Sequence, residues 1–279
     1  MSLCYYRTVA VPKWRLEKLD ATIDEFEEEL SNAIQRLEVK EAEDYLNILL
    51  RTAGKSIVTF REILTLSAHG YPDGALSLAR TLYEQFIIVA FLESKKSNDN
   101  FQKYIQDYHL DYEIQRLKAL KYEAESCHRD TDRAKKIEDK IHYLKTNANR
   151  AGGKGDYWWS GEGSFYEVFK RIHAGVPDEI LKQFIAQLHF AYKRACVSLH
   201  SSSLGNTIRL GDDSSFSGID TSPRVRGAGL PLWLATASFM YIVGVVSEQL
   251  QIDYQPYITR LGDLSKFYQT NVWRENSNV

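Results

Sequence analysis

One apolar stretch constrains the fold more than any other part of this sequence: residues 73–94, DGALSLARTLYEQFIIVAFLES. Nearly every position from Ala75 to Leu92 is apolar, so a helix formed here would be apolar around most of its circumference. Such a helix must be buried on several sides, because one covered face would leave the other apolar side chains in water. We therefore expect it to be the central helix of an all-α protein.

The few polar residues of this stretch share one side of the predicted helix. Ser77, Arg80 and Glu84 follow one another at steps of three and four residues. A charged pair on a buried helix is costly unless it is fully hydrogen-bonded or opens onto a cavity. Two explanations follow: Arg80 and Glu84 pair with each other as part of the core, or they line a binding site.

The rest of the chain also favours helices. Apolar residues at helical spacing predict amphipathic helices over about 14–39, 42–68, 177–200 and 254–268. Residues 230–250, LPLWLATASFMYIVGVVSEQL, approach the length of a membrane span. Because Thr236, Ser238 and Glu248 interrupt this segment, we interpret it as a second buried core helix and expect no membrane contact. The fold class is therefore all-α: a single multi-helix bundle over residues 1–279.

A charged stretch from about residue 101 to 148 is predicted to form a helical hairpin arm. The chain from Arg129 to Lys154 is locally basic, although the whole protein has a formal net charge of −2. Four of its lysines are candidates for contacts with a nucleic-acid backbone: Lys135, Lys136, Lys140 and Lys145. A solvated helix surface explains the same lysines without any nucleic acid.

Two irregular segments interrupt the helical pattern. Residues 148–164 place glycines around two tryptophans, of which Trp159 either anchors the loop to the core or stacks on a planar ligand. Residues 201–229 have no periodicity, and a loop of that length is usually functional, disordered, or both.

The cysteines and the N-terminus bear on the compartment. Cys4, Cys127 and Cys196 are far apart and form no Cys-x-x-Cys pair, which is typical of a reducing environment and argues against a zinc site. The first residues show no basic segment followed by an apolar run, so we expect no secretory signal. We predict a cytoplasmic protein without a metal or another cofactor.

Three segments resemble a bacterial all-helical family of unknown function, the DUF5677 type: LARTLYEQF, the Trp-Ser-Gly of the glycine loop, and YKRACVSLHSSS. The resemblance covers about residues 73–203, and its marks fall on Arg80, Glu84, Trp159, Tyr192 and His200. Cys196 stands where the family often has serine, which puts any role of that hydroxyl in doubt. The resemblance implies family membership and no particular reaction.

The first functional hypothesis is enzymatic. Arg194 and His200 form an Arg-x5-His pair that is similar to the Arg-x4–6-His signature of HEPN-type helical ribonucleases of bacterial toxins and phage defence. His200 would act as acid and base, Arg194 or Arg80 would stabilise the phosphorane, and Glu84 would orient Arg80, with RNA on the basic arm and no metal. Six residues place the two side chains about 120° apart around a continuous helix, so they would converge within one chain only if the helix ended before His200, and otherwise across a two-fold homodimer.

The second hypothesis is a binding or regulatory module without catalysis. Arg80, Glu84, Tyr192 and His200 would line a polar pocket, with Ser77 and Trp159 as further ligand contacts. Its occupant would be an anionic or nucleotide-like small molecule, or a partner protein. The structural alternative is that Arg80 and Glu84 only pair with each other.

Overall fold

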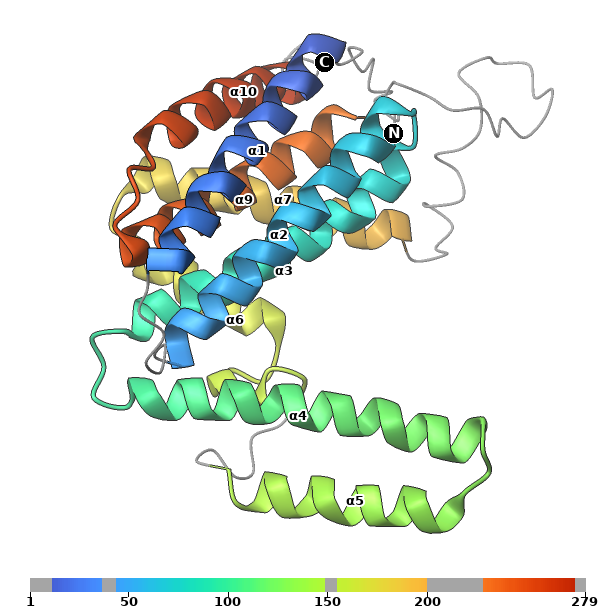
Figure 1. Ribbon diagram of the computed structural model, residues 1–279. Coiled ribbons are helices and arrows are strands. Elements are labelled where there is room, and N and C mark those ends of the chain that lie inside the picture. Colours follow the sequence, from blue (N-terminus) through green and yellow to red (C-terminus); the bar gives the residue numbers. More distant parts are fainter. Residues whose placement is uncertain (1–11, 37–43, 149–154, 200–227, 274–279) are drawn as a thin grey trace, which may run out of the picture. The chain divides into compact units, whose positions relative to one another are not determined.

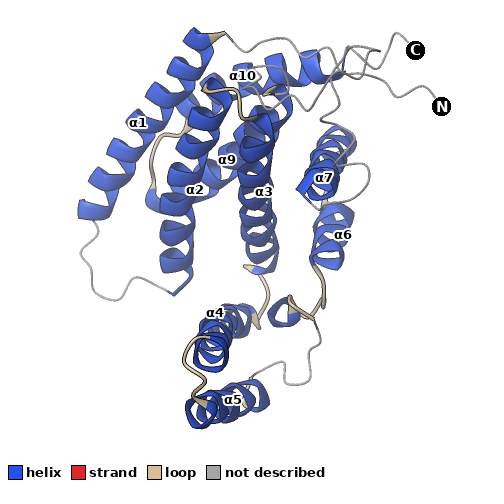
Figure 2. Cartoon of the chain, turned by 90° about the vertical axis from the view of Figure 1, so that its right-hand side faces the viewer, coloured by secondary structure: helices blue, strands red, loops and turns tan. Residues whose placement is uncertain are grey.

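The computed structural model describes residues 12–36, 44–148, 155–199 and 228–273, and the regular elements within these ranges are all helical. Figure 2 shows these helices joined by loops, with no strand in the described part of the chain. The prediction of an all-α fold is confirmed. The elements in chain order (Figure 1) are α1 (Lys13–Arg36), α2 (Asp44–Ala68), α3 (Pro72–Lys95), α4 (Phe101–Ser126), α5 (Thr131–Thr146), the 3-10 helix η1 (Trp158–Ser160), α6 (Phe165–Gly175), α7 (Glu179–Leu199), α9 (Gly229–Leu250) and α10 (Gln255–Trp273).

The chain divides into two compact units. The first unit comprises residues 1–86 and 180–279, and the second comprises residues 87–179. Helix α3 contributes its first part to one unit and its last two turns to the other. The single domain over residues 1–279 stays a prediction.

Helix α9 forms the core of the first unit with α1, α2 and α10. Every residue from Pro231 to Phe239 is buried, as expected for a helix enclosed on all sides. The ring of Phe239 lies 5.0 Å from that of Phe60 on α2 and 6.0 Å from that of Phe26 on α1. Phe26 in turn meets Tyr257 of α10 at 5.6 Å. These aromatic contacts join all four helices, which run alongside one another in Figure 1.

Helix α3 is buried along most of its length, which confirms the interpretation of residues 73–94 as a central helix. No residue from Ala75 to Glu93 is exposed. Leu82, Tyr83 and Phe91 have no accessible surface at all. The side chains that point to α2 include Gln85, whose Oε1 accepts a hydrogen bond of 2.9 Å from Ser56 Oγ.

Two helices, α3 and α9, are long and apolar enough to cross a membrane by length and composition. Their most apolar windows are 61% and 72% buried within the protein, and a core helix passes the same test. The cytoplasmic location and the absence of membrane contact stay predictions.

Helices α4 and α5 of the second unit form the predicted hairpin, lying side by side in both views (Figures 1 and 2). The turn ends at Asp130, whose carboxylate accepts a hydrogen bond of 2.9 Å from the backbone N–H of Arg133 and so caps α5. Each helix buries a narrow apolar stripe against its neighbours, including Ile114 and Leu117 on α4 and Ala134 on α5. Most of the charged side chains of both helices are exposed, as the sequence predicts.

Replacing Phe239 by alanine is expected to destabilise the first unit by about 3 to 5 kcal/mol, because the cavity would open between α1, α2 and α9. Urea denaturation followed by circular dichroism measures the change. Val58→Ala on α2, where the valine is 55% exposed, is the control and should change the free energy of unfolding by less than about 0.5 kcal/mol. Equal effects of the two substitutions would contradict the central position of α9.

Candidate functional site

A polar network joins α3 to α7 in the first unit. Arg80 donates from Nε to Glu84 Oε1 at 3.0 Å, one helical turn further along α3. The hydroxyl of Tyr192 on α7 donates to the same Glu84 oxygen at 3.2 Å. One carboxylate oxygen therefore accepts a donor from each helix, and this arrangement fixes the Glu84 side chain.

Buried aromatic side chains lie directly behind this network. Tyr83 Oη and His189 Nδ1 share a hydrogen bond of 3.2 Å. The His189 ring stacks on Tyr192 at 5.5 Å, and the Tyr83 ring lies 5.1 Å from that of Tyr192. Tyr83 is fully buried and His189 is 7% exposed, so they form a rigid floor under the polar groups. Neither residue was predicted from the sequence as part of the site, although His189 lies about one helical turn before Tyr192 on α7.

The surroundings keep these groups in fixed protonation states. Burial acts to lower the pKa of Arg80, but the negative charge of Glu84 and the hydrogen bond to its carboxylate outweigh burial, so the pKa is raised. The pKa of Tyr192 is raised by burial, by its hydrogen bond with Cys196 and by the charge of Glu84. Tyr192 therefore keeps its proton at neutral pH and acts as a hydrogen-bond donor rather than as a base.

Arg80 can present part of its guanidinium to an acceptor outside the network. Its side chain is 30% exposed, and its described hydrogen bond to Glu84 uses Nε. The two Nη groups are the donors that suit a phosphate or carboxylate in a forked geometry. The Arg80 Cζ lies 5.8 Å from the centre of the Tyr192 ring, whose face adds a weak attraction for the cation.

Three further residues were predicted for this site: Ser77, Arg194 and His200. Ser77 lies on α3, partly exposed, one turn before Arg80. Arg194 lies two residues after Tyr192, hence about 200° around α7, so it does not join the Arg80–Glu84–Tyr192 network. His200 lies outside the described residues. Within the described ranges, no three His, Cys, Asp or Glu side chains are placed to hold a metal ion together.

Trp159 belongs to the second unit and is 2% exposed. Its ring makes edge contacts with Tyr108 at 4.9 Å and with Phe91 at 5.6 Å. The neighbouring Trp158 donates from Nε1 to Asp111 Oδ1 at 2.6 Å. These contacts correspond to the anchoring role that the sequence analysis weighed against ligand stacking.

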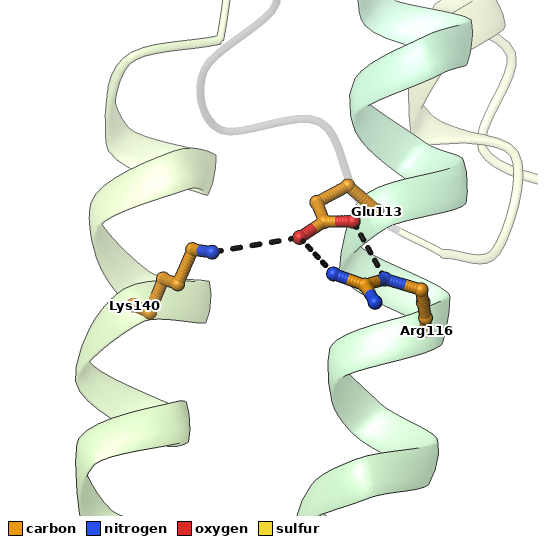
Figure 3. Close-up of polar contacts among 3 residues, drawn as sticks. All are labelled: Glu113, Arg116 and Lys140. Atoms are coloured by element: carbon orange, nitrogen blue, oxygen red, sulfur yellow. Dashed lines mark hydrogen bonds and ion pairs between the residues drawn. The ribbon is translucent and has the colours of Figure 1, made fainter.

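The four predicted lysines of α5 are all exposed, but they do not share one face. Lys136 and Lys140 are one helical turn apart, whereas Lys135 and Lys145 each lie about 140° around the helix from Lys140, in opposite directions. Figure 3 shows that Lys140 reaches Glu113 of α4, with Nζ 3.5 Å from Oε1, and that Arg116 also binds this carboxylate. Part of the positive charge is thus neutralised within the hairpin.

Comparison with models of protein families identified a match. The model of a family of unknown function (DUF5677) matches residues 46–217, which include the Arg80–Glu84–Tyr192 network and the α4–α5 hairpin. The match bears out the resemblance drawn from the sequence motifs. No curated protein matches the chain, and no solved structure does. The similarity to HEPN-type ribonucleases stays a prediction.

A double-mutant cycle tests whether Glu84 and Tyr192 form one energetic unit. Because the two side chains share a hydrogen bond, Glu84→Gln and Tyr192→Phe are expected to be non-additive by about 0.5 to 1.5 kcal/mol in the free energy of unfolding. Glu62→Gln, on the exposed side of α2, provides the matched charge change and should combine additively with Tyr192→Phe. Additivity in both cycles would argue against the network.

Asp111 provides a pH-dependent test of the tryptophan anchor. Burial raises the pKa of Asp111, although its hydrogen bonds with Trp158 and Gln115 oppose this. The folded state therefore binds the proton more tightly than the unfolded state, and the contribution of Asp111 to stability is lost as the pH rises through its folded pKa. Asp111→Asn keeps an acceptor for Trp158 and does not titrate.

The stability of Asp111→Asn relative to the wild type is accordingly expected to increase as the pH rises from about 4, the unfolded pKa of aspartate, towards neutrality. Urea denaturation across this pH range measures the difference. Asp139→Asn, exposed on α5, is the control and should give a smaller change with pH. A relative stability that falls with rising pH would refute the assignment.

Proposed function

Because this chain belongs to the family of unknown function DUF5677, its function must be argued from its own geometry, and we propose that it is a helical binding module that captures an anionic group on Arg80. The ligand would be a small molecule that carries a phosphate or a carboxylate. Arg80 would bind the anion, Glu84 would orient Arg80, and Tyr192 would hold Glu84 in place. No bond of the ligand would be broken.

The observation that carries this proposal is the way in which Glu84 engages Arg80. The carboxylate takes the Nε donor at 3.0 Å, on a helix that is otherwise apolar and buried. An arginine that served only to neutralise Glu84 would gain most from a bidentate contact, with two parallel N–H donors on the carboxylate. The single Nε contact instead supports a second acceptor at the Nη groups.

The rigidity of the surroundings supports a positioning role for Glu84 and Tyr192. Glu84 has two donors on one oxygen, and Tyr192 rests on Tyr83 and His189. A guanidinium held in this way loses little conformational entropy when it binds an anion. The arrangement therefore favours recognition of a group with fixed geometry over a diffuse electrostatic attraction.

The alternative is the metal-independent ribonuclease of the bacterial defence or toxin type. It requires His200, which lies outside the described residues, together with a cationic side chain nearby. Arg194 lies on the opposite side of α7 from Tyr192, so its convergence with the network would need a second protomer. The contacts of Arg80 favour the binding module, which needs neither residue.

Thermal shift and calorimetric titration with AMP, adenosine, inorganic phosphate and succinate test the proposal. At least one anion is expected to stabilise the protein, and adenosine should not. Arg80→Gln should weaken the binding by at least about tenfold, as for a lost charge-assisted hydrogen bond. Arg51→Gln, an exposed arginine of α2, makes the same change in charge and should leave the affinity unaltered.

Glu84→Gln separates positioning from simple electrostatics. Removing a negative charge beside an anion site should strengthen binding if Arg80 acts only through its charge. If Glu84 orients the guanidinium, the variant should bind the anion more weakly despite its more favourable charge. Anion binding that is independent of Arg80, or the absence of binding by every anion tested, would overturn the proposal.

Incubation of the protein with total RNA in EDTA distinguishes the two functions. The binding module leaves the RNA intact in both the wild type and the His200→Ala variant. Cleavage that survives the chelator and disappears in His200→Ala would instead establish the ribonuclease.

A further inference from the structure

We propose that one edge of the α4–α5 hairpin binds single-stranded nucleic acid. This edge, called the basic edge below, consists of Tyr112 and Arg116 on α4 and of Lys136, Lys140 and Tyr143 on α5. It does not depend on the Arg80 network, and the two proposals can succeed or fail separately.

The three residues of α5 form one continuous stripe. Lys136, Lys140 and Tyr143 are spaced i, i+4 and i+7, which places them on the same side of the helix. All three are exposed, and Tyr143 retains 66% of its accessible surface. The buried residue Ala134 faces α4 from a different side, so the stripe is not part of the hairpin interface.

An ion-pair bridge brings a stripe of α4 next to the stripe of α5. Glu113 binds Arg116 through both carboxylate oxygens, at 2.8 Å and 3.0 Å, and meets Lys140 at 3.5 Å (Figure 3). Tyr112 and Arg116 are one turn apart on α4, which places them on the same side of the helix. The bridge therefore assembles Tyr112, Arg116 and Lys140 on one edge.

The basic edge carries an excess of positive charge. Arg116, Lys136 and Lys140 are three cations, and Glu113 is the carboxylate that bridges Arg116 and Lys140, so these four side chains together carry a net charge of plus two. Glu113 also orders Arg116 and Lys140, whose long side chains would otherwise lose entropy on binding. Phosphate groups spaced along a nucleic-acid backbone match such a row of cations.

The two tyrosines decide between the possible polyanions. Tyr112 and Tyr143 are 63% and 66% exposed, although burial of an aromatic ring is normally favourable. Exposed rings beside cations suit unpaired bases, which stack on aromatic side chains irrespective of sequence. A duplex hides its bases, and an acidic peptide offers nothing for the rings to stack on, so single-stranded nucleic acid is the occupant that uses both features.

Fluorescence anisotropy of a short labelled oligo(U) strand, titrated with the full chain at several salt concentrations, tests the inference. We expect the logarithm of the association constant to fall linearly with the logarithm of the salt concentration. The slope should be about −2, as for roughly three phosphate contacts to a single strand. A duplex of the same length and a polyglutamate peptide should bind at least about tenfold more weakly, because neither engages the rings.

Matched pairs of variants locate the site on the surface. Lys136→Gln with Lys140→Gln should lower the affinity and reduce the salt slope by about 1.4, that is, by two contacts of 0.7 each. Lys135→Gln with Lys145→Gln removes the same charge from other faces of α5 and should leave both quantities nearly unchanged. Each variant alters only exposed side chains, and circular dichroism is used to check that it remains folded.

A second pair tests the stacking. Tyr112→Leu with Tyr143→Leu should weaken oligo(U) binding by at least about fivefold without changing the salt slope. Tyr122→Leu is the control, because Tyr122 is equally exposed but lies about 120° around α4 from Arg116.

The proposal is overturned if the wild type does not bind oligo(U), or if the two lysine pairs weaken binding equally. It is also overturned if the duplex binds as tightly as the single strand, or if polyglutamate does. The last result would assign the basic edge to an acidic protein segment.

Discussion

The structure of the first unit depends on how a charged pair is accommodated in one of its two most apolar helices. Helix α3 has no exposed residue from Ala75 to Glu93, yet it carries Arg80 and Glu84 one turn apart. Removing such groups from water is costly unless every charged atom finds a partner. Glu84 meets part of this requirement, because its Oε1 accepts from Arg80 and from Tyr192, so the charged pair depends on the packing of α7 against α3. Loss of the Tyr192 hydroxyl would remove one of the two hydrogen bonds that offset the desolvation of the Glu84 carboxylate. The Arg80 guanidinium, which is held by Glu84, would then be less well ordered.

The helices could be predicted from the sequence because their patterns are local. A segment that is apolar on all sides of its helix, such as α3 or α9, predicts that the helix is buried. The apolar face of an amphipathic helix predicts which side packs against the core. The hairpin of α4 and α5 follows from two helical patterns separated by a short polar turn. The division of the chain into two units did not follow, because α3 continues from one unit into the other without any change in its apolar pattern.

The candidate site could be predicted only in part, for the same reason. Arg80 and Glu84 are visible in one segment, and the resemblance to a known family added Tyr192. Tyr83 and His189 are separated by 106 residues, and no local pattern relates them. Each side chain alone looks like an ordinary core residue, and only the packing of α7 on α3 makes them the floor of the network. The lysines of α5 show the opposite limit: all four are exposed, as expected on a charged helix, but their distribution around the helix decides which of them can act together.

The two polar regions differ in the kind of anion that they can recognise. In the Arg80 network, buried rings and a shared carboxylate oxygen hold the cation in one orientation, which suits a single phosphate or carboxylate of defined geometry. On the basic edge, long exposed side chains surround one bridging carboxylate, so the charges can adapt to successive phosphates but are screened by salt. A partly buried cation gains strength from its lower-dielectric surroundings and loses adaptability, whereas an exposed row of cations gains adaptability and loses strength. The exposed tyrosines offset that loss, because stacking on a base does not weaken as the ionic strength rises in the way that a phosphate contact does.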